Sequence, residues 1–242
     1  MGGLDWQGKA LYGAAGSASD VHCFIMGKMK ADPARGESRW PALAGLIAIG
    51  FLNYVLPRWL NVGPRWLLMV IVLLFAVPLV LSHRAQQAQL NRNFGIALNA
   101  IVTLALVASV VLLVSSLPGR KESPTQLLIS AGALWFSNIL VFASWYWRLD
   151  GGGPHQRDLR ASHDDGAFLF PQMALHPEAP AGGRPWTPMF VDYLFLAFNT
   201  STALSPADTQ VLSRWAKLMM MFQAMISLTV IVLVAARAVN IL

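Results

Sequence analysis

The side chains that could perform chemistry lie in two groups in the C-terminal half of the sequence. The first group belongs to a stretch from 148 to 188 that is rich in Gly, Pro, Asp and Arg, which predicts a long extramembrane connection. Its potential metal ligands match no known ligand spacing, so we expect solvated loop residues, no metal site and no cofactor. The ligand-type residues are His155, His163, Asp164, Asp165 and His176.

No part of the sequence has the pattern of a catalytic centre. Ser130 and Ser137 have no neighbouring His and carboxylate, and no Gly-x-Ser-x-Gly motif occurs. The glycine run 151–153 lacks the strand and helix that a nucleotide-binding motif requires. We therefore expect no catalytic residues and predict that the protein is not an enzyme. A membrane enzyme or transporter that uses the 148–188 connection is the least supported alternative.

The second group is a run of oxygen-bearing side chains at the end of a short apolar segment, 191–204. This segment is too short to cross a bilayer, and a half-length helix that ends in hydroxyl groups predicts a re-entrant element. The oxygen-bearing side chains are Asn199, Thr200, Ser201, Thr202, Ser205 and Asp208.

The composition places these groups in an integral membrane protein. Of the 242 residues, 55% are hydrophobic and 12% are charged, whereas a soluble domain has about 25% charged residues. The basic residues are scattered through the connectors, so we expect the lipid bilayer as a partner and no nucleic acid. We predict an all-α fold with five full membrane helices and one short re-entrant helix. The predicted spans are Pro41–Leu56, Trp66–Ser82, Phe94–Leu117, Leu127–Trp147 and Leu218–Leu242.

The polar residues inside these spans argue against proton coupling. No Asp or Glu lies in any span, and intramembrane carboxylates are typical of proton relays. Asn53, Asn99 and Asn138 do lie in spans. We expect them to form hydrogen bonds between helices, and a substrate site is the alternative.

The C-terminal part of the chain resembles the pore domain of tetrameric potassium channels over roughly its last hundred residues. The predicted outer helix 127–147 and the pore-type helix 191–204 are followed by a turn at 205–208. Ser213-Arg-Trp-Ala-Lys217 then resembles the start of an inner helix 213–242, and Val234-Ala-Ala-Arg237 its end. The same stretch is similar to the C-terminus of a family of uncharacterised bacterial integral membrane proteins. The sequence thus divides into a polar N-terminal extension (1–39), membrane helices (40–121) and a channel-like module (122–242).

The filter of the channel family is degenerate here. The family motif is Thr-Val-Gly-Tyr-Gly-Asp. In this sequence Ala203 stands at the threonine, Ser205 and Ala207 stand at the two glycines, and Pro206 stands at the tyrosine. Asp208 matches the aspartate. A potassium filter is a column of backbone carbonyl groups. The glycines of the filter adopt backbone dihedral angles that cost other residues about 1–2 kcal/mol. At the position where some inner helices bend at glycine, this chain has Ser227, our hinge candidate.

The resemblance implies a channel-like homo-oligomer, tetrameric as in the family, in the bacterial inner membrane. Its pore-type helix would aim the negative end of its dipole at a monovalent cation, with Thr200 and Thr202 as oxygen ligands. The candidate pore or constriction residues are Asn199, Thr200, Ser201, Thr202, Ala203, Leu204, Ser205, Pro206, Ala207 and Asp208. The alternative is a nonconducting membrane scaffold or partner subunit that retains the pore-domain fold.

The distribution of basic residues conflicts with a channel-like orientation. Thirteen Lys and Arg lie on the same side of the membrane as the 148–188 connection, and five lie on the other side. The positive-inside rule places that connection in the cytoplasm, whereas a channel-like orientation places it outside. A wrong span, a pore loop that enters from the cytoplasm and a misleading resemblance would each explain the conflict.

Overall fold

The computed structural model describes residues 37, 39–84, 88–116, 123–159, 166–175, 186–202 and 209–239. All of them belong to one compact unit, Glu37–Leu242, which is predominantly helical. Except for Glu37 and Arg39, the predicted N-terminal extension lies outside the described residues. The α-helices are α2 (Trp40–Val55), α3 (Trp66–Arg84), α4 (Ala88–Ser116), α5 (Pro124–Leu149), α6 (Pro154–Leu159), α7 (Pro171–Leu175), α8 (Phe190–Thr202) and α9 (Arg214–Val239).

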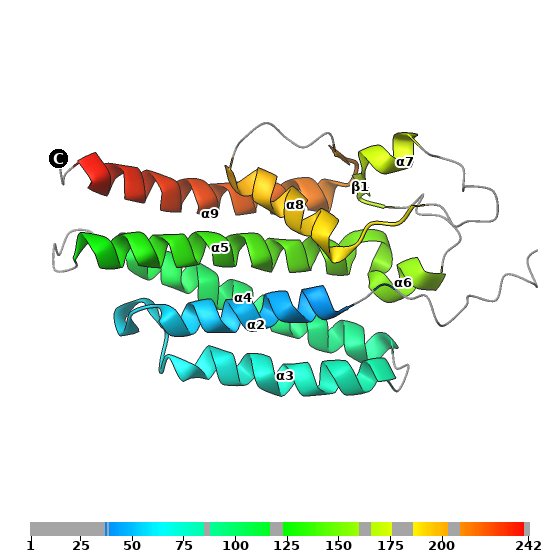
Figure 1. Cartoon of the computed structure of the whole chain (residues 1–242), viewed down its shortest axis with the longest axis horizontal. Coiled ribbons are helices and arrows are strands. Elements are labelled where there is room, and N and C mark those ends of the chain that lie inside the picture. The colour runs from blue at the N-terminus through cyan, green and yellow to red at the C-terminus, as the bar shows by residue number, and fades with distance from the viewer. Residues whose placement is uncertain are drawn as a thin grey trace, which may run out of the picture. The chain divides into compact units, whose positions relative to one another are not determined.

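Helix α5 lies at the centre of the bundle. It packs against α2, α4, α8 and α9, while α3 packs against α2 and α4 (Figure 1). Val141, Phe142 and Ala143 are consecutive and all fully buried. Because consecutive helical residues point about 100° apart, burial of all three indicates that neighbours surround α5. The helix therefore positions most of the polar groups described below.

Three helices are long and apolar enough to cross a membrane: those containing Gln89–Ser116, Thr125–Leu159 and Arg214–Ala236. Two further apolar helices, Trp40–Val55 and Trp66–Leu79, are shorter. The prediction of a mostly helical chain with helices that can cross a membrane is therefore confirmed in part: three helices qualify by length and composition, and five full spans are not confirmed. The 16 residues of α2 extend about 24 Å at ~1.5 Å per residue, less than the ~30 Å of hydrocarbon that a full span must cross.

One end of the bundle collects several helix ends. The helices α2, α4, α8 and α9 begin there, and α5 ends there (Figure 1). We call it the arginine end, because Arg39, Arg92, Arg148 and Arg157 lie at it. The opposite end carries the 3-10 helix Arg58–Leu60 between α2 and α3.

The described part of the 148–188 stretch is structured. A 3-10 turn, Asp150–Gly152, leads from α5 into α6. Strand β1 (Phe168–Leu169) then pairs antiparallel with β2 (Gln210–Val211), with Phe168 opposite Val211. The Phe168 ring packs against Tyr146, Tyr193 and Trp215. These contacts fix the start of α8 and α9 against the end of α5.

Candidate functional site

The predicted pore residues Asn199–Thr202 form the last turn of α8, and Ala203–Asp208 lie outside the described residues. Ser201 is buried, and Asn199, Thr200 and Thr202 are partly exposed. The Thr200 hydroxyl donates a hydrogen bond to the Leu196 carbonyl at 2.9 Å. The Thr202 hydroxyl donates to the carbonyls of Phe198 and Asn199 at 3.2 and 3.1 Å. Both threonine protons are therefore used within the helix.

Side chains of α9 donate hydrogen bonds to the last two turns of α8. The final four carbonyls of a helix, among them that of Ser201, have no partner within the helix itself. The Gln223 amide donates to the Ala197 carbonyl at 2.7 Å and to the Ser201 hydroxyl at 2.8 Å. The Ser227 hydroxyl donates to the Ser201 carbonyl at 2.5 Å. Ser227, the hinge candidate, is thus a buried residue within the single helix α9 whose side chain holds the end of α8.

Helix α5 completes this arrangement, which we call the α8 cap: Trp135, Asn138, Tyr146, Ser201, Gln223 and Ser227. The Tyr146 hydroxyl donates to Gln223 Oε1 at 2.5 Å, and Trp135 Nε1 donates to the Ser227 hydroxyl at 3.1 Å. Asn138 Nδ2 donates to the Gln223 carbonyl at 3.2 Å and to the Ser201 hydroxyl at 3.4 Å. Three helices are joined in this way at the depth where α8 stops.

The predicted interhelical role of the intramembrane asparagines is confirmed at two of three positions. Asn138 joins α5 to α8 and α9, and Asn99 Oδ1 of α4 accepts a hydrogen bond from Ser144 of α5 at 2.9 Å. The side chain of Asn53 makes no hydrogen bond to another described residue. The role of Gln223 could not be predicted from the sequence, because a single glutamine in an apolar helix has no motif around it.

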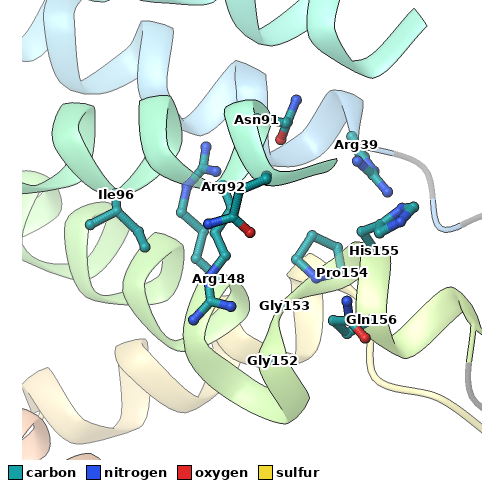
Figure 2. Close-up of a pocket in the computed structure, with 11 residues that line it drawn as sticks. Arg39, Asn91, Arg92, Ile96, Arg148, Gly152, Gly153, Pro154, His155 and Gln156 are labelled. Atoms are coloured by element: carbon teal, nitrogen blue, oxygen red, sulfur yellow. The ribbon is translucent and has the colours of Figure 1, made fainter. Parts of the chain in front are cut away.

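A small polar cavity of about 60 Å³ lies at the arginine end, between the starts of α2 and α4 and the turn that follows α5 (Figure 2). Of the ligand-type residues predicted in the loop, His155 lines this cavity; the other four lie outside the described residues. Within the described ranges no three His, Cys, Asp or Glu side chains converge as metal ligands. The cavity is lined by Arg39, Gln89, Asn91, Arg92, Ile96, Arg148, Gly152, Gly153, Pro154, His155 and Gln156.

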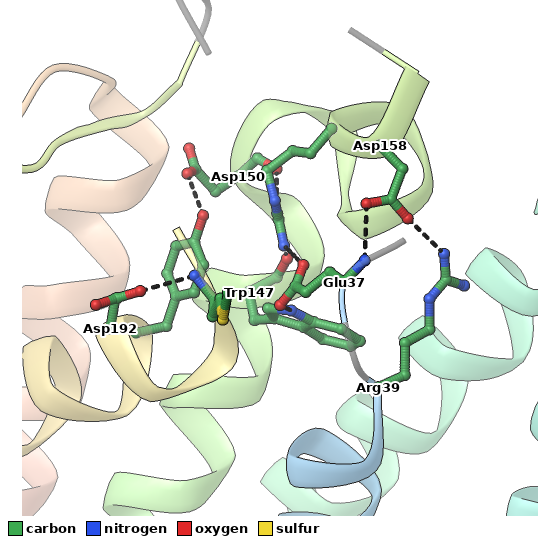
Figure 3. A network of polar contacts seen from close by, with 9 residues as sticks. Glu37, Arg39, Trp147, Asp150, Asp158 and Asp192 are labelled. Atoms are coloured by element: carbon green, nitrogen blue, oxygen red, sulfur yellow. Dashed lines mark hydrogen bonds and ion pairs between the residues drawn. The ribbon is translucent and has the colours of Figure 1, made fainter. Parts of the chain in front are cut away.

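Beside the cavity, a buried cluster of polar contacts includes Glu37, Trp147 and Asp150 (Figure 3), and Arg157 is at its centre. Its guanidinium donates to the carbonyls of Trp147 and Asp150 at 2.8 and 2.9 Å, and lies 2.9 Å from Glu37 Oε2. Trp147 Nε1 donates to Glu37 Oε1 at 2.5 Å. Burial raises the pKa of the Glu37 carboxyl, and the charge of Arg157 opposes that shift. The cluster ties the residue before α2 to the end of α5.

Asp150 extends the cluster to α8 and β1. Its carboxylate is fully buried and accepts hydrogen bonds from the Ala167 amide at 2.5 Å and the Tyr193 hydroxyl at 2.6 Å. The chain can turn here because Gly151, Gly152 and Gly153 have φ values of 57°, 81° and 96°, a region favoured by glycine. The glycine run thus builds a turn, and its Asp-Gly-Gly-Gly-Pro context is a turn signal that sequence reasoning could have used.

Comparisons with protein families, with curated proteins and with solved structures found no match for this chain. Its function is therefore argued from the residues described above.

Proposed function

We propose that the protein is a nonconducting scaffold or partner subunit of a bacterial inner membrane. In this proposal α5, α8 and α9 keep the helix order of a pore domain without forming an ion pathway. The observation that carries the proposal is the α8 cap. The Ala197 and Ser201 carbonyls and the Ser201 hydroxyl, near the end of α8, are bonded to α9 of the same chain, and the Ser201 hydroxyl is also bonded to α5.

An ion site needs oxygen atoms that can replace the hydration shell of the ion. The carbonyls of Ala197 and Ser201 at the end of α8 accept hydrogen bonds from Gln223 and Ser227 instead. These donors also neutralise the negative end of the helix dipole, which would otherwise attract a cation. A cation would have to displace them to reach the same oxygens.

The outward faces of α8 and α9 support the same proposal. The exposed side chains of both helices are largely aliphatic or aromatic, and a surface of this kind suits lipid or a neighbouring helix rather than water. A hydrated pore between copies of the chain would need polar groups on these faces. The large exposed hydrophobic residues are Val191, Phe195, Phe198, Leu218, Met221, Phe222, Met225, Leu228, Ile231 and Val232.

A channel-like homotetramer that conducts monovalent cations is the second candidate. The observation in its favour is that α5, α8 and α9 pack against one another in the order outer helix, half-length helix, inner helix. The partly exposed Asn199 and Thr200 could then line a constriction.

Ion flux in liposomes that contain the purified, folded protein distinguishes the two candidates. The scaffold proposal expects no flux of K⁺ or Na⁺ above that of empty vesicles. Flux that changes selectivity in Thr202→Ala would overturn it and support the channel. Thr229→Ala is the matched control, because the Thr229 hydroxyl makes an equivalent hydrogen bond to Met225 within α9 at 2.8 Å.

A further inference from the structure

Arg148 is a buried cation for which the described residues supply no counter-ion. Its side chain belongs to the last turn of α5, and the residue is 6% exposed. Nε is buried and makes no hydrogen bond, and no carboxylate of the described part of the chain pairs with the guanidinium. The group instead lies over the Trp147 ring, 5.5 Å from its centroid. Burying a charge lowers the stability of the folded state unless the charge is paired, so an anion bound beside Arg148 would stabilise the protein.

The surroundings of Arg148 collect positive charge. Arg39, Arg92 and His155 line the same cavity (Figure 2), and no Asp or Glu is among the described residues that line it. Asp158 is the nearby carboxylate: it pairs with Arg39 Nη2 at 3.3 Å, while Arg39 Nε has no partner. Arg92 is exposed and makes no ion pair with a described residue. An anion in the cavity would therefore meet several guanidinium groups, while the neighbouring described carboxylates of Asp158 and Glu37 are paired with Arg39 and Arg157.

Backbone dipoles add to this charge. Helices α2 and α4 both begin beside the cavity, and the Arg39 side chain at the start of α2 makes no capping hydrogen bond. The first amides of a helix carry free N–H groups and a partial positive charge, which attract anions.

The size of the cavity narrows the choice of anion. A water molecule needs about 10–15 Å³ of such space, so about 60 Å³ accommodates roughly four oxygen-sized groups. That number fits a tetrahedral oxyanion. Arginine forks recognise phosphate oxygens in pairs, which a halide could not satisfy.

We propose that this cavity binds a phosphate group, with Arg148 as its central ligand and Arg39 and Arg92 at its rim. The phosphate is that of an anionic lipid at the membrane surface or that of a small soluble phosphate; the chemistry at the arginines is the same. The site is independent of ion conduction, so it does not rest on the scaffold proposal.

Gly95 provides a test that leaves every charge in place. A Cβ atom at this position of α4 would lie 1.7 Å from Arg148 Nη1, so Gly95→Ala must move the guanidinium. Arg148→Gln removes the charge directly, and Arg92→Gln removes an exposed rim charge that makes no ion pair with a described residue. Arg65→Gln is the matched control, because Arg65 is an exposed arginine at the opposite end of the bundle.

The full-length protein, purified in detergent and stripped of lipid, is titrated in two arms. One arm uses inorganic phosphate, and the other uses short-chain phosphatidylglycerol, with phosphatidylcholine as its zwitterionic counterpart that carries no net charge. Binding is measured as a saturable rise in the unfolding temperature. Saturation by phosphate identifies a soluble ligand, and saturation by phosphatidylglycerol alone identifies a lipid.

We expect Arg148→Gln and Gly95→Ala to weaken binding at least about tenfold, as the loss of a charge-assisted hydrogen bond implies. Arg92→Gln should weaken it less, and Arg65→Gln should bind as the wild type does. Should Arg148→Gln fail to fold, the binding of phosphate or phosphatidylglycerol by Gly95→Ala and Arg92→Gln tests the proposal. Wild-type protein that binds neither phosphate nor phosphatidylglycerol overturns the proposal, as does undiminished binding by the folded Gly95→Ala and Arg92→Gln variants.

Discussion

Gln223 bonds to both of its neighbouring helices from the middle of α9. It donates to the Ala197 carbonyl and the Ser201 hydroxyl of α8 and accepts from the Tyr146 hydroxyl of α5. Hydrogen bonds between membrane helices contribute about 0.6 kcal/mol each on average. We expect Gln223→Leu to lower the free energy of unfolding by about 2 kcal/mol, measured by denaturant titration in detergent micelles.

Met221→Leu is the control for this prediction, because Met221 is 62% exposed on the same helix. Its unfolding free energy should stay within about 0.5 kcal/mol of wild type. Equal stability of Gln223→Leu and Met221→Leu would mean that the cap does not hold α8.

Glu37 gives the arginine end a dependence on pH. Burial raises the pKa of its carboxyl above the ordinary value of 4.5. A group with a raised pKa contributes stability below its unfolded pKa, and this contribution is lost as the pH rises through the folded pKa. Glu37→Gln stays neutral at every pH. The unfolding free energy of the wild type should therefore fall, relative to that of Glu37→Gln, as the pH rises above 4.5. Thermal unfolding of both proteins from pH 4 to 8 measures the difference; a constant difference would contradict the raised pKa.

At the scale of the element, the turn between α5 and α6 depends on Gly153. Its φ is 96°, and a Cβ there would lie 2.8 Å from the Arg148 carbonyl oxygen. Backbone strain of this kind costs about 1–3 kcal/mol. We expect Gly153→Ala to lower the unfolding free energy by at least that amount.

Gly132 provides the comparison within α5, because nothing lies within 4 Å of a Cβ built there. Gly132→Ala should leave the protein unchanged or stabilise it by about 0.5–1 kcal/mol, since alanine favours the helix. Thermal unfolding of Gly153→Ala and Gly132→Ala, measured side by side, tests whether the turn requires glycine at 153. A Gly153→Ala protein as stable as Gly132→Ala would show that the turn tolerates a side chain.

The helices could be predicted from the sequence, whereas most of their polar contacts could not. Long apolar runs identified α4, α5 and α9, because a bilayer requires uninterrupted hydrophobic length. The apolar run that forms α2 is shorter, at 16 residues, so its length does not identify it as a full membrane span. The hydroxyl groups at the end of α8 were evident in the sequence, but Gln223, which donates to the Ser201 hydroxyl, lies 22 residues from Ser201 along the chain. No local pattern reveals such a pairing.

The arginine end shows the same limitation. Asp150 and Arg157 lie close in sequence, but their partners Tyr193 and Glu37 come from distant segments. The connection appeared solvated because it is rich in charge and glycine. In the structure, Asp150 and Arg157 are buried. Charge in a loop predicts exposure only where no counter-charge reaches it.

For the whole molecule, the positive-inside rule predicts that the arginine end faces the cytoplasm. In a Cys23→Ser background, we expect Val62→Cys, 70% exposed at the opposite end, to react with an impermeant thiol reagent in intact cells. Leu159→Cys, 58% exposed on α6, should react only after permeabilisation. The reverse pattern would place the arginine end outside, which is the orientation of a channel-like pore domain.

The α8 cap has a consequence for biogenesis. The donors that satisfy the end of α8 belong to α9, which leaves the ribosome after it. Until Gln223 and Ser227 arrive, the last carbonyls of α8 have no partner from α9, and hydrocarbon offers no substitute. The half-length helix can therefore take its final place only once α9 is inserted. A nascent chain that stops before Gln223 should leave α8 accessible to protease, so the last membrane helix completes the assembly of the one before it.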